Sequence, residues 1–163
     1  MFGLTSLGLV HTAFSLVAVA AGLIALIRFG RIVPASTLGR LYLWTTVITC
    51  LSGFGIFQHG GFGKPHALGV LTLLVLAVAV LARRGRFGRA SLAVETVSYS
   101  MTFLFHMIPG ITETTTRLPL GAPLLPNADA PELKVASGVL FVLFVVGATL
   151  QVLRLRRTGM APA

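Results

Sequence analysis

Long runs of apolar residues, separated by short polar clusters, extend along the whole chain. Five of these runs approach the ~20 residues that a helix needs to cross the hydrocarbon core of a bilayer. They cover residues 5–27, 41–58, 67–82, 90–108 and 133–153. Because backbone polar groups inside lipid must be paired within the protein, such runs predict helices and not sheets. The pattern therefore predicts an all-α integral membrane protein, a single domain over residues 1–163 with five transmembrane helices.

The connections and the helix faces predict an up-and-down bundle. Most loops are short, so consecutive helices are expected to be antiparallel neighbours. Small and polar residues, which favour close helix contact in lipid, form a stripe on each of the first two helices. The stripes are His11, Ser15, Ala18, Gly22 and Ala25, and Thr45, Thr49, Ser52 and His59. The fifth helix is uniformly apolar over 139–146 and is expected to lie outside a four-helix core, while the proline-rich segment 109–131 is expected to cap the outer end.

Composition and charge support a membrane location. Hydrophobic residues make up 55% of the chain and charged residues 10%, more apolar surface than one soluble domain can bury. The net charge of +9 comes from basic residues beside the apolar runs and not from one extended soluble face, so nucleic acid is not the expected partner. Ten of the 13 basic residues fall on one side of a five-helix trace. The positive-inside bias then places the arginine-rich loops and the C-terminus in the cytoplasm and the N-terminus outside.

The four histidines are expected at one depth near the outer face. His11, His59, His66 and His106 each lie 17 to 19 residues from the arginine that bounds the same helix on the cytoplasmic side. This corresponds to roughly 25 to 29 Å along a helix. Histidine near the interface can simply reach water, which suits His59 and His66 at the two ends of a loop. His11 and His106 are flanked by apolar residues, where ionisable groups usually serve an interior site.

Three functions fit this layer of histidines. The first is electron transfer by a heme b with His11 and His106, or His59 and His66, as axial pairs. Lys64, Arg117 and Lys134 are the basic residues placed to meet its propionates, and a quinone or a redox protein would be the partner. The second is a metal-dependent enzyme or metal-handling protein that binds copper, zinc or iron through the same four histidines. The third is a structural or transport subunit without a cofactor.

Polar residues also mark one face of the fourth helix. Glu95, Tyr99, Thr102 and His106 recur at spacings of four, three and four. This face is expected to point inward and to offer a proton path from the cytoplasmic half toward the histidines. The alternative is that Glu95 reaches the inner interface or pairs with a loop arginine. Further along, Glu113 and Arg117 are four residues apart and are expected to pair if this segment is helical.

Short motifs in the first two thirds of the chain suggest a family. They are Leu38-Gly39-Arg40-Leu41-Tyr42-Leu43-Trp44, Ser52-Gly53, His66-Ala67-Leu68-Gly69 and Glu113-x-x-x-Arg117. Together they resemble an uncharacterised family of small bacterial polytopic membrane proteins, and more loosely the membrane b-type cytochromes. The resemblance implies the bacterial inner membrane and a histidine-dependent site, but no activity. Members often carry a histidine just before the Leu-Gly-Arg, where this chain has Ser36-Thr37.

Overall fold

The computed structural model describes residues 5–57 and 61–159 and is all-α over this part of the chain. Its elements, in chain order, are α1 (Ser6–Phe29), α2 (Thr37–Gly53), α3 (Lys64–Arg83), the short 3-10 helix η1 (Gly88–Ala90), α4 (Ser91–Arg117) and α5 (Pro131–Thr158). Five long helices therefore occupy the five predicted apolar runs, and the predicted all-α class is confirmed for the described residues. Apart from the end of α4, the boundaries differ from the predicted ones by at most five residues.

Local sequence signals set several of the helix ends. The hydroxyl of Thr5 accepts a hydrogen bond from the Gly8 amide at the start of α1, and Ser36 accepts one from the Gly39 amide at the start of α2. Each caps an amide that the first helical turn leaves without a partner. Gly30 ends α1 in the left-handed conformation with φ 71°, which glycine adopts without a Cβ penalty.

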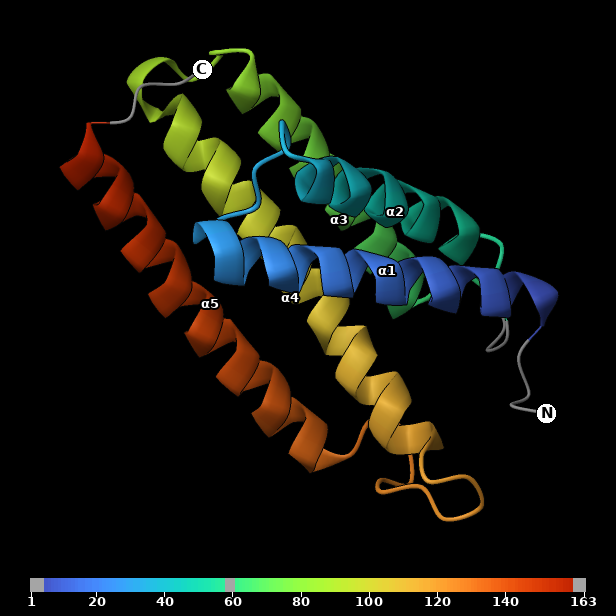
Figure 1. Ribbon diagram of the computed structural model, residues 1–163. Coiled ribbons are helices and arrows are strands. Elements are labelled where there is room, and N and C mark those ends of the chain that lie inside the picture. Colours follow the sequence, from blue (N-terminus) through green and yellow to red (C-terminus); the bar gives the residue numbers. More distant parts are fainter. Residues whose placement is uncertain (1–4, 58–60, 160–163) are drawn as a thin grey trace.

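The helices pack in adjacent pairs (Figure 1). α1 lies along α2, α3 lies along α4, and α5 packs on the outer side of α4, with fewer contacts between α1 and α4. The most apolar stretch of α5 contains no buried residue, so the prediction of a peripheral fifth helix is confirmed. Ala18, Gly22 and Ala25 of the predicted α1 stripe are buried, which lets α1 approach its neighbours closely.

Large apolar side chains face outward and small or polar side chains face inward. Thr46, Thr96 and Thr102 are fully buried, while Phe141, Leu143 and Leu150 of α5 are more than half exposed. A soluble domain buries its large apolar residues and rarely exposes such a continuous apolar surface. Among the described residues, α1, α3 and α5 are long and apolar enough to cross a membrane. The surface is thus suited to contact with lipid.

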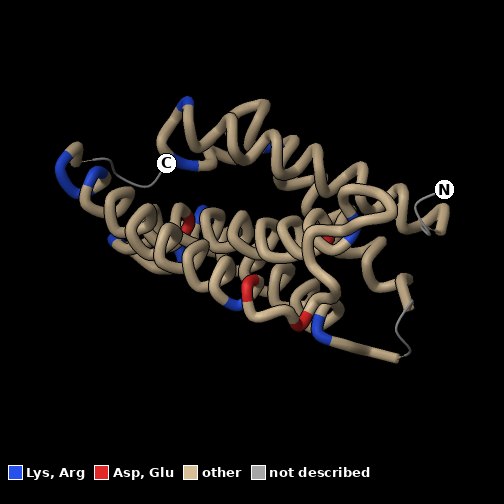
Figure 2. Tube along the Cα trace, turned by 90° about the horizontal axis from the view of Figure 1, so that it is seen from below, with Lys and Arg blue, Asp and Glu red and all other residues tan. Residues whose placement is uncertain are grey.

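The charges are distributed unequally between the two ends of the helices (Figure 2). Most lysines and arginines lie toward one end, whereas most of the acidic residues lie nearer the other. This arrangement agrees with the charge pattern from which the orientation was predicted.

The predicted outer cap is wrong over its first nine residues. The fourth helix was expected to end at residue 108, but α4 continues through Pro109 to Arg117. A proline removes a single backbone hydrogen bond, and the threonines that follow use their hydroxyl groups within the helix, as Thr112 does by donating to the Ile108 oxygen one turn back. The connection to α5 is therefore only residues 118–130, and it joins the neighbouring ends of α4 and α5 (Figure 1).

Candidate functional site: two histidines that contact one helix

His11 of α1 is half-buried against α2. Its Nδ1 lies 3.0 Å from the backbone oxygen of Thr49 and 3.3 Å from the hydroxyl of Ser52. A carbonyl oxygen can only accept, so Nδ1–H is the donor and the neutral ring keeps its lone pair on Nε2. Gly53 leaves room for the imidazole ring, because a Cβ at this position would lie only 3.1 Å from Cε1 of His11. His11 is therefore held with one nitrogen available to accept a proton or bind a metal.

His106 of α4 contacts the same helix about one turn earlier. It is 6% exposed, and its Nε2 lies 3.0 Å from the hydroxyl of Thr46. The ring of Tyr42 meets the imidazole edge-on, with 6.0 Å between the ring centroids. Thr46 and Thr49 are three residues apart, so the two histidines meet α2 about one turn, or ~4.5 Å, apart along its axis. The structure thus places His11 of α1 and His106 of α4 against neighbouring turns of α2.

A second polar contact joins α2 and α4 closer to the centre of the bundle. The Tyr42 hydroxyl lies 2.8 Å from Thr102 Oγ1, and Thr102 itself donates to the backbone oxygen of Tyr99 at 2.9 Å. Because the single hydroxyl proton of Thr102 is used on that carbonyl, Tyr42 donates to Thr102. The chain of hydrogen bonds ends at a backbone oxygen, which has no proton to pass on. Proton transfer beyond Thr102 therefore requires its hydroxyl to rotate.

The predicted inward face of α4 is confirmed. Glu95, Tyr99, Thr102 and His106 are all buried. Among the described side chains none forms a salt bridge or a hydrogen bond with the Glu95 carboxyl group, and Arg31 and Arg83 are the cations whose charges act on it. Glu95 thus lies buried on the face that was proposed as a proton path, and the alternative pairing with a loop arginine is not formed among the described residues.

His66 belongs to a separate environment on α3. Its Nδ1 accepts a hydrogen bond from the Gly63 amide at 3.2 Å, so the proton of the neutral ring is on Nε2. That Nε2 is buried and has no hydrogen-bond partner among residues 5–57 and 61–159. Phe57 stacks on the ring at 4.9 Å and Phe62 lies at 5.2 Å. His59, which was predicted to join it, lies outside the described residues.

Two of the three basic residues expected to meet heme propionates pair with acidic residues. Lys64 lies 3.8 Å from Asp129, and both side chains are almost fully exposed. Arg117 pairs with Glu113 one turn earlier on α4, as predicted from their spacing. Lys134 is exposed near the start of α5. Binding of heme propionates by Lys64 and Arg117 therefore remains a prediction.

Within residues 5–57 and 61–159, no three histidine, cysteine, aspartate or glutamate side chains come together as a metal site. Two surface hollows of about 390 and 230 Å³ lie elsewhere, and neither is lined by a histidine. A site formed by the described histidines therefore offers a pair of imidazoles, with any further ligand to come from outside this group.

Sequence reasoning missed two members of this site. Tyr42 was named only as part of a family motif and not as a site residue. Thr46 was not named, although Thr45 and Thr49 were assigned to the polar stripe of the second helix. The available signal was the spacing of Tyr42, Thr46 and Thr49, which puts all three on one face of a helix. Comparisons with protein-family models, curated proteins and solved structures find no match to this chain.

Proposed function

We propose that this chain is a multi-pass protein of the bacterial inner membrane, with all five helices spanning the bilayer, that binds a heme b near the outer face for electron transfer. The observation that carries the proposal is that His11 and His106, from two different helices, hydrogen-bond to neighbouring turns of α2. Ionisable residues are costly in a membrane interior and usually serve a cofactor, ion or proton there. A quinone or a redox protein would be the electron partner.

The hydrogen bonds of the two histidines determine which ring nitrogen of each is free to ligate the heme iron. His11 donates Nδ1–H to a backbone carbonyl, the arrangement that orients a ligating imidazole and leaves Nε2 for the metal. His106 can offer Nε2 once its single bond to Thr46 is released. His66 presents an N–H at Nε2 instead, so the alternative pair His59 and His66 is supported less well. When bound, the heme would supply one-electron redox chemistry, and the protein would supply the two ligands.

The heme prediction is tested by the absorption spectrum of the purified protein. The wild type in detergent is expected to show a Soret band that shifts on dithionite reduction. His11→Ala and His106→Ala should each lose most of this band because a six-coordinate heme needs both ligands. His66→Ala is the matched control and should retain it. A colourless wild type, or a band that survives loss of both His11 and His106, contradicts the proposal.

A metal-dependent enzyme or metal-handling protein is the second candidate. It is favoured by Glu113, a carboxylate that lies two turns after His106 on the same face of α4 and could complete a site. A colourless sample that carries stoichiometric copper, zinc or iron, lost in His11→Ala, would support this candidate over heme. A sample with neither heme nor metal, and with wild-type behaviour after replacement of all four histidines, would support a structural or transport subunit.

The proposed orientation makes a separate prediction. In a Cys50→Ala background, Pro123→Cys in the outer connection should react with a membrane-impermeant maleimide on intact spheroplasts. Arg86→Cys, in the loop between α3 and α4, should react only after lysis, since arginine-rich loops remain in the cytoplasm. The two positions serve as controls for each other, and the opposite labelling pattern would reverse the topology.

A further inference from the structure

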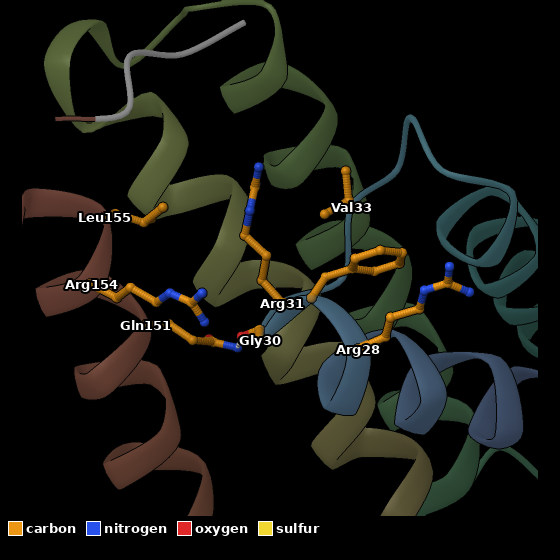
Figure 3. A pocket seen from close by; sticks show the side chains of 8 residues that line it. Arg28, Gly30, Arg31, Val33, Gln151, Arg154 and Leu155 are labelled. Carbon is orange, nitrogen blue, oxygen red and sulfur yellow. Dashed lines mark hydrogen bonds between the residues drawn. The ribbon is translucent and has the colours of Figure 1, made fainter. Parts of the chain in front are cut away.

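A cationic hollow lies where the end of α1 meets α5, at the arginine-rich end of the helices (Figure 3). It measures about 390 Å³. Its polar part is formed by arginines from both helices and by Gln151. Phe29, Val33 and Leu155 supply its apolar part. The lining residues are Arg28, Phe29, Gly30, Arg31, Val33, Gln151, Arg154 and Leu155, and none of them is acidic.

The side chains of α5 converge on the end of α1. Figure 3 shows Arg154 and Gln151 reaching toward Gly30, with Arg31 rising beside them and Arg28 turned to the other side. Arg154 Nη1 lies 2.7 Å from the point that a Cβ of Gly30 would occupy, so the missing side chain is what admits the guanidinium. Gln151 donates a hydrogen bond of 2.9 Å to the Gly30 oxygen. This bond occupies a carbonyl at the negative end of the α1 dipole that would otherwise repel an anion.

No acidic residue lines the hollow, although the charge of Arg31 also acts on the Glu95 carboxyl group of α4. Arg31 and Arg154 form no salt bridge with any described residue, and Arg28 lies 5.5 Å from the centre of the Phe29 ring. Guanidinium groups match the geometry of phosphate oxygens and bind them through paired hydrogen bonds. Two guanidinium groups that form no salt bridge with a described residue, beside an amide side chain, therefore suit a phosphate-bearing anion.

An apolar hollow of about 230 Å³ shares Gln151 with the cationic one. It runs between α4 and α5, with Leu26 of α1 at its edge, and small residues Gly147 and Ala148 open it. Its span from Gln151 to Leu140 is about 16 Å along α5, roughly half of the ~30 Å hydrocarbon thickness. The lining residues are Leu26, Ser100, Phe103, Leu104, Met107, Leu140, Leu143, Phe144, Gly147, Ala148 and Gln151.

We infer that the two hollows together bind one anionic phospholipid, with its phosphate at Arg31 and Arg154 and an acyl chain between α4 and α5. A free phosphate would satisfy the arginines but leave the adjoining apolar groove without a role. A zwitterionic lipid would bring a second cation toward the arginines. Anionic lipids are attracted to basic pockets between helices at the cytoplasmic surface. The inference rests on the proposed membrane insertion, but not on a cofactor at the histidines.

Lipid retention by the purified full chain tests the site. Native mass spectrometry would compare phosphatidylglycerol with phosphatidylcholine of the same acyl chains. We expect preferential retention of phosphatidylglycerol, and a loss of roughly tenfold in Arg31→Gln/Arg154→Gln, since each guanidinium contributes to binding of an anionic surface. Arg156→Gln/Arg157→Gln removes the same charge from the exposed end of α5 and should retain the lipid. Equal retention of both lipids, or an equal loss in the control variant, overturns the inference.

A substitution in the groove separates lipid from free phosphate. Gly147→Leu places a side chain in the apolar hollow, where nothing lies within 4 Å of the added Cβ. It should lower phosphatidylglycerol retention, whereas Gly138→Leu, also on α5 and equally open, should not. If Gly147→Leu has no effect and inorganic phosphate displaces the lipid completely, the site binds free phosphate and the inference is wrong. Because Gly147→Leu leaves every arginine in place, it tests binding of an acyl chain in the apolar hollow even if the arginine variant fails to fold. The failure of maleimide labelling to match the proposed topology would be a distinct result.

Discussion

Gly39→Ala is expected to destabilise the protein by roughly 3 kcal/mol or more. A Cβ at this position would lie 1.9 Å from the backbone oxygen of Val33 and 2.4 Å from its carbon. Backbone atoms cannot swing aside as a flexible side chain can, so the loop between α1 and α2 would have to move. That loop is also held by Ser36, which donates to the Val33 oxygen at 2.7 Å and caps the Gly39 amide. The glycine of the Leu38-Gly39-Arg40 motif thus has a structural role.

The measurement is the free energy of unfolding in detergent, with Gly138→Ala as the matched control. Gly138 is also within a helix, but nothing lies within 4 Å of its added Cβ. Alanine is favoured over glycine in an open helix by up to about 1 kcal/mol, so this control should be neutral or stabilising. Equal stability of the Gly39 variant and the control would contradict the close approach of Gly39 and Val33.

Tyr42→Ala is expected to be the most costly truncation in the core, at about 3–5 kcal/mol. The side chain is fully buried, with its ring against His106 and its hydroxyl bonded to Thr102. It also lies against Gly22, where a Cβ would come within 3.0 Å of its ring, so no neighbour can collapse into the space without moving a helix. Trp44→Ala on the same helix is the control, since Trp44 is 64% exposed and should change stability far less.

Tyr42→Phe separates the hydroxyl from the ring. It should cost only about 0.6–1.5 kcal/mol, the range for one hydrogen bond between buried groups or between membrane helices. Thr102 keeps its bond to the Tyr99 oxygen in this variant, which limits the loss. Unfolding measurements on Tyr42→Phe, Thr102→Val and the double variant should give a positive coupling energy. Additive effects would mean that the 2.8 Å contact does not contribute to stability.

The sequence by itself determined the helices and much of how they face one another. The apolar runs are local properties whose meaning follows from the need to pair every backbone group within a helix. Small residues at Ala18, Gly22 and Ala25 similarly predict a contact face, because only they allow close approach. The uniformly apolar α5 could be assigned to the outside for the same kind of reason. None of these inferences needs the identity of a neighbouring helix.

Only the tertiary structure decided which polar groups meet. The histidines were expected at one depth, yet depth along a helix says nothing about its rotation or its neighbours. His11 hydrogen-bonds to Thr49 and His106 to Thr46, about one turn apart on α2, while His66 lies apart among phenylalanines. Pro109 was an equally ambiguous signal, since a proline can either end a helix or be accommodated within it. Hydrogen bonds between helices depend on crossing geometry, which periodicity within a single helix does not encode.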